Sequence, residues 1–182
     1  MSLMDTRLLF VATTTGLLAL SVPLTASADA TGASAATITV TGGSLSITVP
    51  TDAGNLGTRA NSVGGGTISG ALGTVQVSDA RNAAAGSGWV ASVISTAFTP
   101  PAIVGPAIAA SAVAYTVGPI TKVGTATYTP NDPSNLSGVA PALTATSITG
   151  DNSASWNPTI TVTIPGGVGA GVYSATITHS VV

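Results

Sequence analysis

The chain is poor in charged residues, and this scarcity excludes several classes of function. Only 5% of its 182 residues are charged, four basic and six acidic, whereas ordinary soluble domains have about 25%. So few basic side chains cannot build the positive surface that binding to a phosphate backbone requires, which excludes nucleic acid as a partner. The surface must instead stay hydrated through Thr, Ser, Asn and backbone groups.

Cysteine and glutamate are absent, and His179 is the single histidine. Without cysteine the chain can form neither disulfides nor zinc–thiolate sites. A Ser-His-Asp triad would depend on His179, and no Gly-x-Ser-x-Gly elbow is present. A glycosidase would need paired carboxylates, and the aspartates are scattered. We therefore expect no enzymatic activity, no cofactor and no metal.

Residues 1–28 have the layout of a secretory signal. Arg7 precedes an apolar stretch over residues 8–20, and Pro23 follows this stretch. Ala26-Ser27-Ala28 then offers small residues for cleavage. The apolar stretch is too short to cross a bilayer. The sequence therefore predicts export, a mature domain over residues 29–182, and no membrane span.

The rest of the chain alternates β-branched and polar residues between clusters of Gly, Pro and Asn, and the clusters at 131–135 and 150–153 predict turns. Residues 37–41 and 45–49, separated by Gly42-Gly43, predict a hairpin. We expect residues 101–114 to form a covering loop with one helical turn. Further strands are predicted at 74–78, 89–98, 112–117, 121–129, 143–148, 159–164 and 172–182. The sequence thus predicts an all-β fold, a single-domain antiparallel β-sandwich with Gly/Pro-rich loops.

Two segments carry unusual residues for this chain. The first joins Asp79-Ala80-Arg81 to Gly86-Ser87-Gly88-Trp89, and the second runs from Trp156 through a Gly-rich turn to Tyr173-Ser174-Ala175-Thr176-Ile177-Thr178. Together they resemble the WxL domain of Gram-positive surface proteins. In that family an Asp-x-Arg segment precedes Gly-Trp, and a Tyr-x-Ala-Thr strand leads into Trp-x-Leu. The resemblance spans roughly residues 37–182, with Ala91 in place of the first leucine and His179 in place of the second tryptophan.

The resemblance implies a secreted protein that associates non-covalently with the cell wall surface. Its partner would be peptidoglycan or another wall glycan, and other surface proteins could be further partners. Sheet pairing is expected to set Trp89 and His179 side by side, with aromatic rings available to stack on sugars. Asp79 and Arg81 are expected to brace the loop by a charge-assisted hydrogen bond. The candidate binding residues are Trp89, Asp79, Arg81, His179 and Trp156.

Each candidate also has a purely structural interpretation. Trp89 fits the core as well as it fits a ligand contact, and Trp156 fits a position that fills the sandwich. His179 can be a buried or rim imidazole, and Asp79 with Arg81 can be a structural loop pair. Isolated aspartates such as Asp132 and Asp151 are typical of turns rather than of calcium sites.

An alternative function is structural. A weakly charged, Thr-rich β domain can polymerise by strand addition, through the final strand ending at Val182 or through the arm of residues 29–36. Ice or crystal binding by Thr159, Thr161 and Thr163 is a third possibility, but threonine on the solvent face of a strand reflects ordinary β-propensity.

Overall fold

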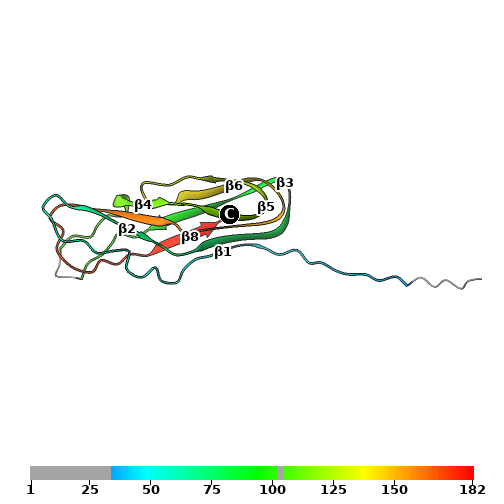
Figure 1. Cartoon of the computed structure of the whole chain (residues 1–182), viewed down its shortest axis with the longest axis horizontal. Coiled ribbons are helices and arrows are strands. Elements are labelled where there is room, and N and C mark those ends of the chain that lie inside the picture. The colour runs from blue at the N-terminus through cyan, green and yellow to red at the C-terminus, as the bar shows by residue number, and fades with distance from the viewer. Residues whose placement is uncertain (1–33, 102–104) are drawn as a thin grey trace, which may run out of the picture. The chain divides into compact units, whose positions relative to one another are not determined.

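The computed structural model describes residues 34–101 and 105–182, so the predicted signal segment 1–28 lies outside the described residues. Residues 40–182 form one compact unit made of two antiparallel sheets and a single 3₁₀ turn at Ala110–Ala112 (Figure 1). The predicted all-β, sandwich-like fold is confirmed. Within the described ranges no helix is long and apolar enough to cross a membrane.

The larger sheet has five strands. In it β1 (Leu45–Thr48), β3 (Val75–Ser95), β6 (Ala140–Trp156) and β5 (Ile120–Pro130) are neighbours in that order, and β8 (Ile177–Val181) also pairs with β3. β1 pairs with the beginning of β3 and β8 pairs with its end, with Ala91 opposite Val181. β1 and β8 also contact each other. One edge of the long strand β3 therefore pairs with two short strands, β1 along its first half and β8 along its second half.

The large sheet folds back on itself in the middle of its long strands. Asp79 of β3 lies opposite Asn152 of β6, yet the indole nitrogen of Trp89, ten residues further along β3, is only 3.0 Å from Asn152 Oδ1. In a straight strand Trp89 would be about 33 Å from Asp79. The register shifts three times between Asp79 and Trp89, and bulges of this kind bend strands. Figure 1 shows the ribbon turning back at the end labelled β3, β5 and β6.

Residues with positive φ mark the bend in all three long strands. They are Asn82 and Gly86 in β3, Gly124 in β5, and Ser147 and Gly150 in β6. Only glycine, and less readily asparagine, adopts this conformation at low cost. The sequence of the bend thus permits one sheet to supply two facing layers.

The smaller sheet, in the order β2 (Gly66–Ala71), β7 (Thr159–Ile164) and β4 (Val113–Thr116), joins the same core. The alternation predicted for residues 159–164 is present, because Ile160 and Val162 are buried while Thr159 and Thr163 are exposed. Trp89, Tyr115 and Trp156 belong to one hydrophobic cluster with the buried valines, leucines and isoleucines of both sheets. Burial of this apolar surface is the main force that stabilises the fold.

The predicted hairpin of residues 37–49 is wrong. Residues 37–41 form no strand, and the side chains of Ile38 and Val40 are 91% and 87% exposed. The second half of the hairpin does become β1, but it pairs with β3 instead. β1 pairs with β3 and contacts β8, so its neighbours come from strands that are distant in sequence.

Two predicted turns also prove to be strand. The Gly-rich segment before Trp89 lies inside β3, and residues 150–153 lie inside β6. Both segments form the bend, where bulges interrupt the ladder without ending it. The strand β2 was not predicted, because Gly66 and Gly70 weaken its pattern. In the segment 101–114, the expected helical turn is present at Ala110–Ala112, and residues 102–104 lie outside the described residues.

Gly88 gives the first testable consequence of the bend. A Cβ at this position would lie 2.7 Å from the carbonyl oxygen of Ala145, a backbone atom that cannot move aside easily. We expect Gly88→Ala to lower the free energy of unfolding by about 1–3 kcal/mol, measured by urea denaturation. Gly138→Ala is the matched control, because nothing lies within 4 Å of its Cβ. Equal stability of the two variants would contradict this account of the Gly-Trp pair.

Candidate functional site

Asp79 and Arg81, from the first signature, form a bidentate ion pair at the bend. Arg81 Nε donates to Asp79 Oδ1 at 2.8 Å and Arg81 Nη2 donates to Oδ2 at 2.9 Å. The Arg81 backbone N–H adds a third bond to Oδ1 at 3.1 Å. The expected brace between these two residues is therefore confirmed, although it lies within a strand and not in a loop.

Three more side chains complete what we call the Asp79 cluster: Trp89, Tyr128 and Asn152. Asn152 Nδ2 donates to Asp79 Oδ2 at 3.4 Å, and Trp89 Nε1 donates to Asn152 Oδ1 at 3.0 Å. The ring centroids of Trp89 and Tyr128 are 5.7 Å apart and tilted by 54°, a favourable aromatic geometry. Asn152 thus links the ion pair to the indole across the two layers.

The electrostatics of the Asp79 cluster keep the carboxylate charged. Asp79 is 1% exposed, and burial alone would raise its pKa. The hydrogen bonds and charge of Arg81 outweigh burial, so the pKa of Asp79 lies below its ordinary value. Burial and the charge of Asp79 together raise the pKa of Tyr128. The charged cluster therefore stabilises the bend at neutral pH.

The second signature contributes to a separate group, the Tyr115 cluster of Tyr115, Trp156 and His179. Trp156 Nε1 donates to the Tyr115 hydroxyl at 2.8 Å, and His179 Nε2 is 3.2 Å from the same hydroxyl. The rings of Tyr115 and His179 meet edge to face at 5.6 Å. Because Trp156 donates to the hydroxyl, the hydroxyl proton can be donated in turn to His179 Nε2.

Burial controls the protonation of the Tyr115 cluster. Desolvation lowers the pKa of His179 to about 4 and raises the pKa of Tyr115 above its usual value. The buried Nδ1 of His179 has no hydrogen-bond partner among the described residues. A proton on the imidazole would therefore be poorly compensated, and His179 is neutral at physiological pH.

The expectation that Trp89 and His179 lie side by side is wrong, although the strands that contain them are neighbours. The two strands do pair, but His179 lies opposite Val93 and not Trp89. Trp89 belongs to the Asp79 cluster and His179 to the Tyr115 cluster. Trp89 and Trp156 are each only 2% exposed, so neither indole face can stack on a sugar ring in this structure. Of the two interpretations of Trp89, the structure favours the core residue.

The remaining aspartates of interest have turn and bend roles. Asp132 Oδ1 accepts the backbone N–H of Val117 at 2.7 Å, and Asp151 Oδ1 accepts that of Asn82 at 2.8 Å. Asp132 itself has a φ of 43°, which aspartate tolerates in tight turns. Across the described ranges, no three His, Cys, Asp or Glu side chains gather closely enough to hold a metal ion.

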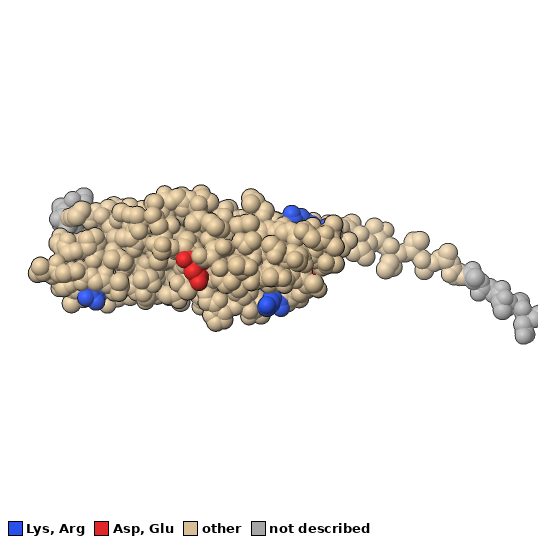
Figure 2. All heavy atoms as spheres, turned by 90° about the horizontal axis from the view of Figure 1, so that it is seen from above, with Lys and Arg blue, Asp and Glu red and all other residues tan. Residues whose placement is uncertain are grey.

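Surface features are few on this weakly charged protein. Figure 2 shows a face on which isolated basic and acidic side chains are scattered among uncharged atoms. One open hollow lies where the β3–β8 pairing continues beyond both strands, and we call it the Thr96 hollow. Its lining consists of Thr96, Ala97, Thr99, Ser174, Ala175 and Thr176.

Backbone pairing holds the two walls of the Thr96 hollow together. Thr96 N–H donates to the carbonyl of Thr176, and Thr99 and Ser174 exchange two backbone hydrogen bonds. Thr96 Oγ1 also accepts the N–H of Thr176 at 2.9 Å. Ser174 and Thr176 are exposed. The hollow is therefore a rigid, uncharged platform that presents hydroxyl groups to solvent.

Several of these residues gave no usable signal in the sequence. The Gly-Asp-Asn-Ser pattern of residues 150–153 predicts that Asn152 is a turn residue. In the structure its side chain is 5% exposed and joins the two layers of the large sheet. Tyr115 and Tyr128 were not singled out as the partners of the two tryptophans. The threonines and serines of the Thr96 hollow cannot be distinguished by type from the many others in the chain.

No protein-family model matches the chain, and it matches neither a curated protein nor a solved structure.

Proposed function

We propose that this protein is a secreted, non-enzymatic binding protein that associates non-covalently with a cell-wall glycan such as peptidoglycan. One observation carries the proposal. The two segments that resemble the WxL signatures, far apart in the sequence, are neighbouring antiparallel strands, with β8 paired to the end of β3. A shared surface over both segments is what the resemblance implies for wall association.

The Thr96 hollow is the part of this surface that suits a glycan. It lies directly beyond the β3–β8 pair, and its exposed hydroxyls can exchange hydrogen bonds with sugar hydroxyls and acetamido groups. The scarcity of charge suits contact with a large polymer, because few charged groups need to be desolvated. Retention would rest on many weak polar contacts rather than on tryptophan stacking.

Co-sedimentation with isolated Gram-positive cell walls tests the proposal. We expect the protein to pellet with the walls, and Ser174→Asp or Thr176→Asp to weaken binding at least about tenfold, because each removes a hydroxyl and adds a charge that must be desolvated. Thr163→Asp is the matched control, since Thr163 is an exposed threonine on the smaller sheet. If the unaltered protein stays in the supernatant, this function is rejected, and if all three variants bind alike, the Thr96 hollow is rejected as the binding surface.

A second candidate function is self-assembly by strand addition, and one observation favours it. The segment 37–41 has the composition of a strand but no strand partner among residues 34–101 and 105–182. The final strand β8, the other donor considered from the sequence, is already paired with β3. Of the arm 29–36, residues 29–33 lie outside the described residues.

A further inference from the structure

Residues 37–41, Thr-Ile-Thr-Val-Thr, are five consecutive β-branched residues, and we call them the donor segment. Such residues have the strongest preference for extended, half-buried positions in sheets. Here they form no strand, and Ile38 and Val40 are 91% and 87% exposed. Two large apolar side chains on one face of an extended segment would normally be buried against a sheet. The donor segment therefore lacks the partner for which its pattern is suited.

The large sheet offers one long strand edge to such a segment. β5 is the last strand of the sheet and pairs only with β6. Its second half, residues 126–130, includes the regular pairing of residues 127–130 after the two register shifts of this strand. Tyr128 in this half is only partly buried, with Trp89 packed against its ring and Lys122 Nζ 5.9 Å from the ring centroid, so further apolar side chains at this edge would pack on the part of the ring that these two leave uncovered.

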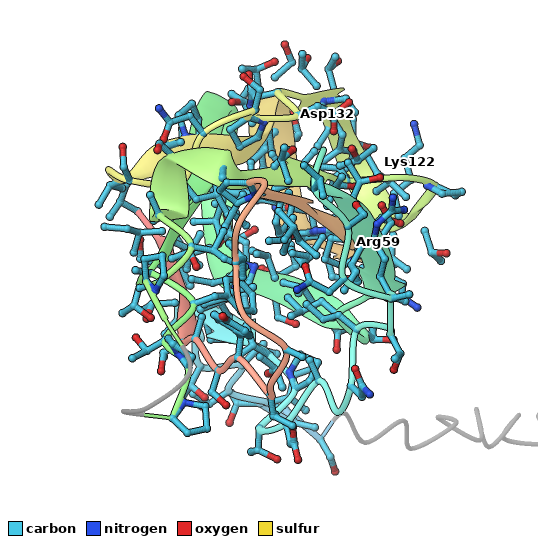
Figure 3. All side chains as sticks on the ribbon, turned by 90° about the vertical axis from the view of Figure 1, so that its left-hand side faces the viewer. Arg59, Lys122 and Asp132 are labelled. Carbon is cyan, nitrogen blue, oxygen red and sulfur yellow. The ribbon has the colours of Figure 1, made fainter. Side chains whose placement is uncertain are left out.

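The other edges are shorter or partly covered. The opposite edge of the large sheet consists of the short strands β1 and β8, which contact each other, and the backbone of Leu56 lies against Gly70 of β2. Beside β4, Tyr115 N–H donates to the carbonyl of Pro133 and Val117 N–H to Asp132. On β5, Lys122 is the one charged residue, and it lies in the first half of the strand; Figure 3 shows it at the periphery of the view. A charged residue or a proline protects an edge locally, which leaves residues 126–129, between Lys122 and Pro130, without such protection.

A copy of the chain cannot place the donor segment on its own β5. Gly43 is fixed beside β1 by its N–H bond to the carbonyl of Ala80 at 2.7 Å. Thr41, two residues away, lies within about 7 Å of Gly43. The position outside β5 is four strand spacings from β1, or about 19 Å along the sheet. The donor segment can therefore reach this edge only in another molecule.

We propose that the donor segment of one copy adds as a strand to residues 126–130 of a second copy. Ile38 and Val40 would then cover the open side of Tyr128, and the backbone of the donor segment would pair with the free edge of β5. Because each molecule has one donor segment and one acceptor edge, the contact is head-to-tail and continues into a chain of copies. This inference rests on the second candidate function and names its donor and acceptor.

Light scattering during size-exclusion chromatography of the purified protein tests the donor. We expect dimers and larger species whose fraction rises with concentration, and a monomer for the double variant Ile38→Asp, Val40→Asp, with association weakened at least about a hundredfold. The matched control is Val63→Asp, Val172→Asp, at valines that are 97% and 78% exposed elsewhere; it should assemble like the unaltered protein. A monomer at every concentration overturns both the inference and the second candidate function.

Cross-linking tests the acceptor, and the absence of native cysteine makes it selective. Thr39→Cys protein is mixed separately with Thr127→Cys, Thr129→Cys and, as control, Thr163→Cys protein, then mildly oxidised. We expect mixed disulfides with position 127 or 129 and none with 163, because a disulfide requires Cβ atoms about 3.5–4.5 Å apart. Assembly with no such selectivity overturns the donor–acceptor pair while self-assembly survives. Wall co-sedimentation of the Ile38→Asp, Val40→Asp variant, expected unchanged, keeps this result separate from wall binding.

Discussion

Replacing Trp89 with alanine is expected to lower the free energy of unfolding by about 3–5 kcal/mol, the usual range for a large aromatic ring removed from a core. Trp89 is 2% exposed, packs against Tyr128 and donates its indole N–H to Asn152. The substitution would leave a cavity between the two layers of the large sheet at the bend. Urea denaturation monitored by circular dichroism measures the loss.

Trp89→Phe separates the two contributions of this residue. Phenylalanine retains most of the apolar ring but cannot donate to Asn152 Oδ1, which would then receive only the longer bond from the Tyr128 hydroxyl at 3.4 Å. We expect a loss of about 1–3 kcal/mol, smaller than that of the alanine variant. A loss below about 1 kcal/mol for Trp89→Ala would show that the ring does not hold the layers together.

A binding defect of a Trp89 variant would reflect loss of the folded protein rather than loss of a contact with the wall. The tryptophan of the Gly-Trp signature lies inside the protein, so Trp89→Ala would reduce wall binding by destabilising the whole domain. A loss caused by direct contact is instead expected from Ser174 and Thr176, whose side chains reach solvent. Comparing the stability and wall binding of both sets of variants distinguishes these two explanations.

Local patterns in the sequence predicted the regular part of the fold. The alternation of Ile160 and Val162 with threonines correctly gave a strand with one buried face. The expected pairing of the two signature segments is also present, because β8 lies beside β3. A strand with one buried face can be predicted in this way because the alternation of apolar and polar side chains is visible within the segment itself.

The bend and the two clusters could not be predicted in this way. Gly86 and Asn82 are typical turn residues, and nothing local shows that a strand continues through them with bulges. The bend in turn decides that Asn152 meets Trp89. The hairpin of residues 37–49 failed for a related reason, since the partners of β1 come from β3 and β8, which are distant in sequence.

Acidification is expected to destabilise the protein between pH 6.5 and about 4, through His179. Its pKa is lowered by burial from an ordinary value of 6.5 to about 4, so in this range the unfolded chain binds a proton that the folded protein does not. The contribution of His179 to stability is therefore constant above pH 6.5, falls as the pH decreases, and levels off below the folded pKa. Allowing for partial exposure of the imidazole, we expect a loss of about 2 kcal/mol, measured from urea unfolding curves at several pH values.

His179→Gln is the matched variant, because its amide oxygen can still accept the Tyr115 hydroxyl proton while the side chain cannot titrate. We expect its stability to be flat between pH 6.5 and 4. The Asp79–Arg81 pair does not obscure this window, since the pKa of Asp79 is lowered below 3.8 and its contribution is lost only in stronger acid. If the glutamine variant loses stability in the same range as the unaltered protein, the pH dependence does not originate in the Tyr115 cluster. If the glutamine variant keeps its stability in this range, the partly buried imidazole of His179 makes the pairing of β8 with β3 sensitive to acid.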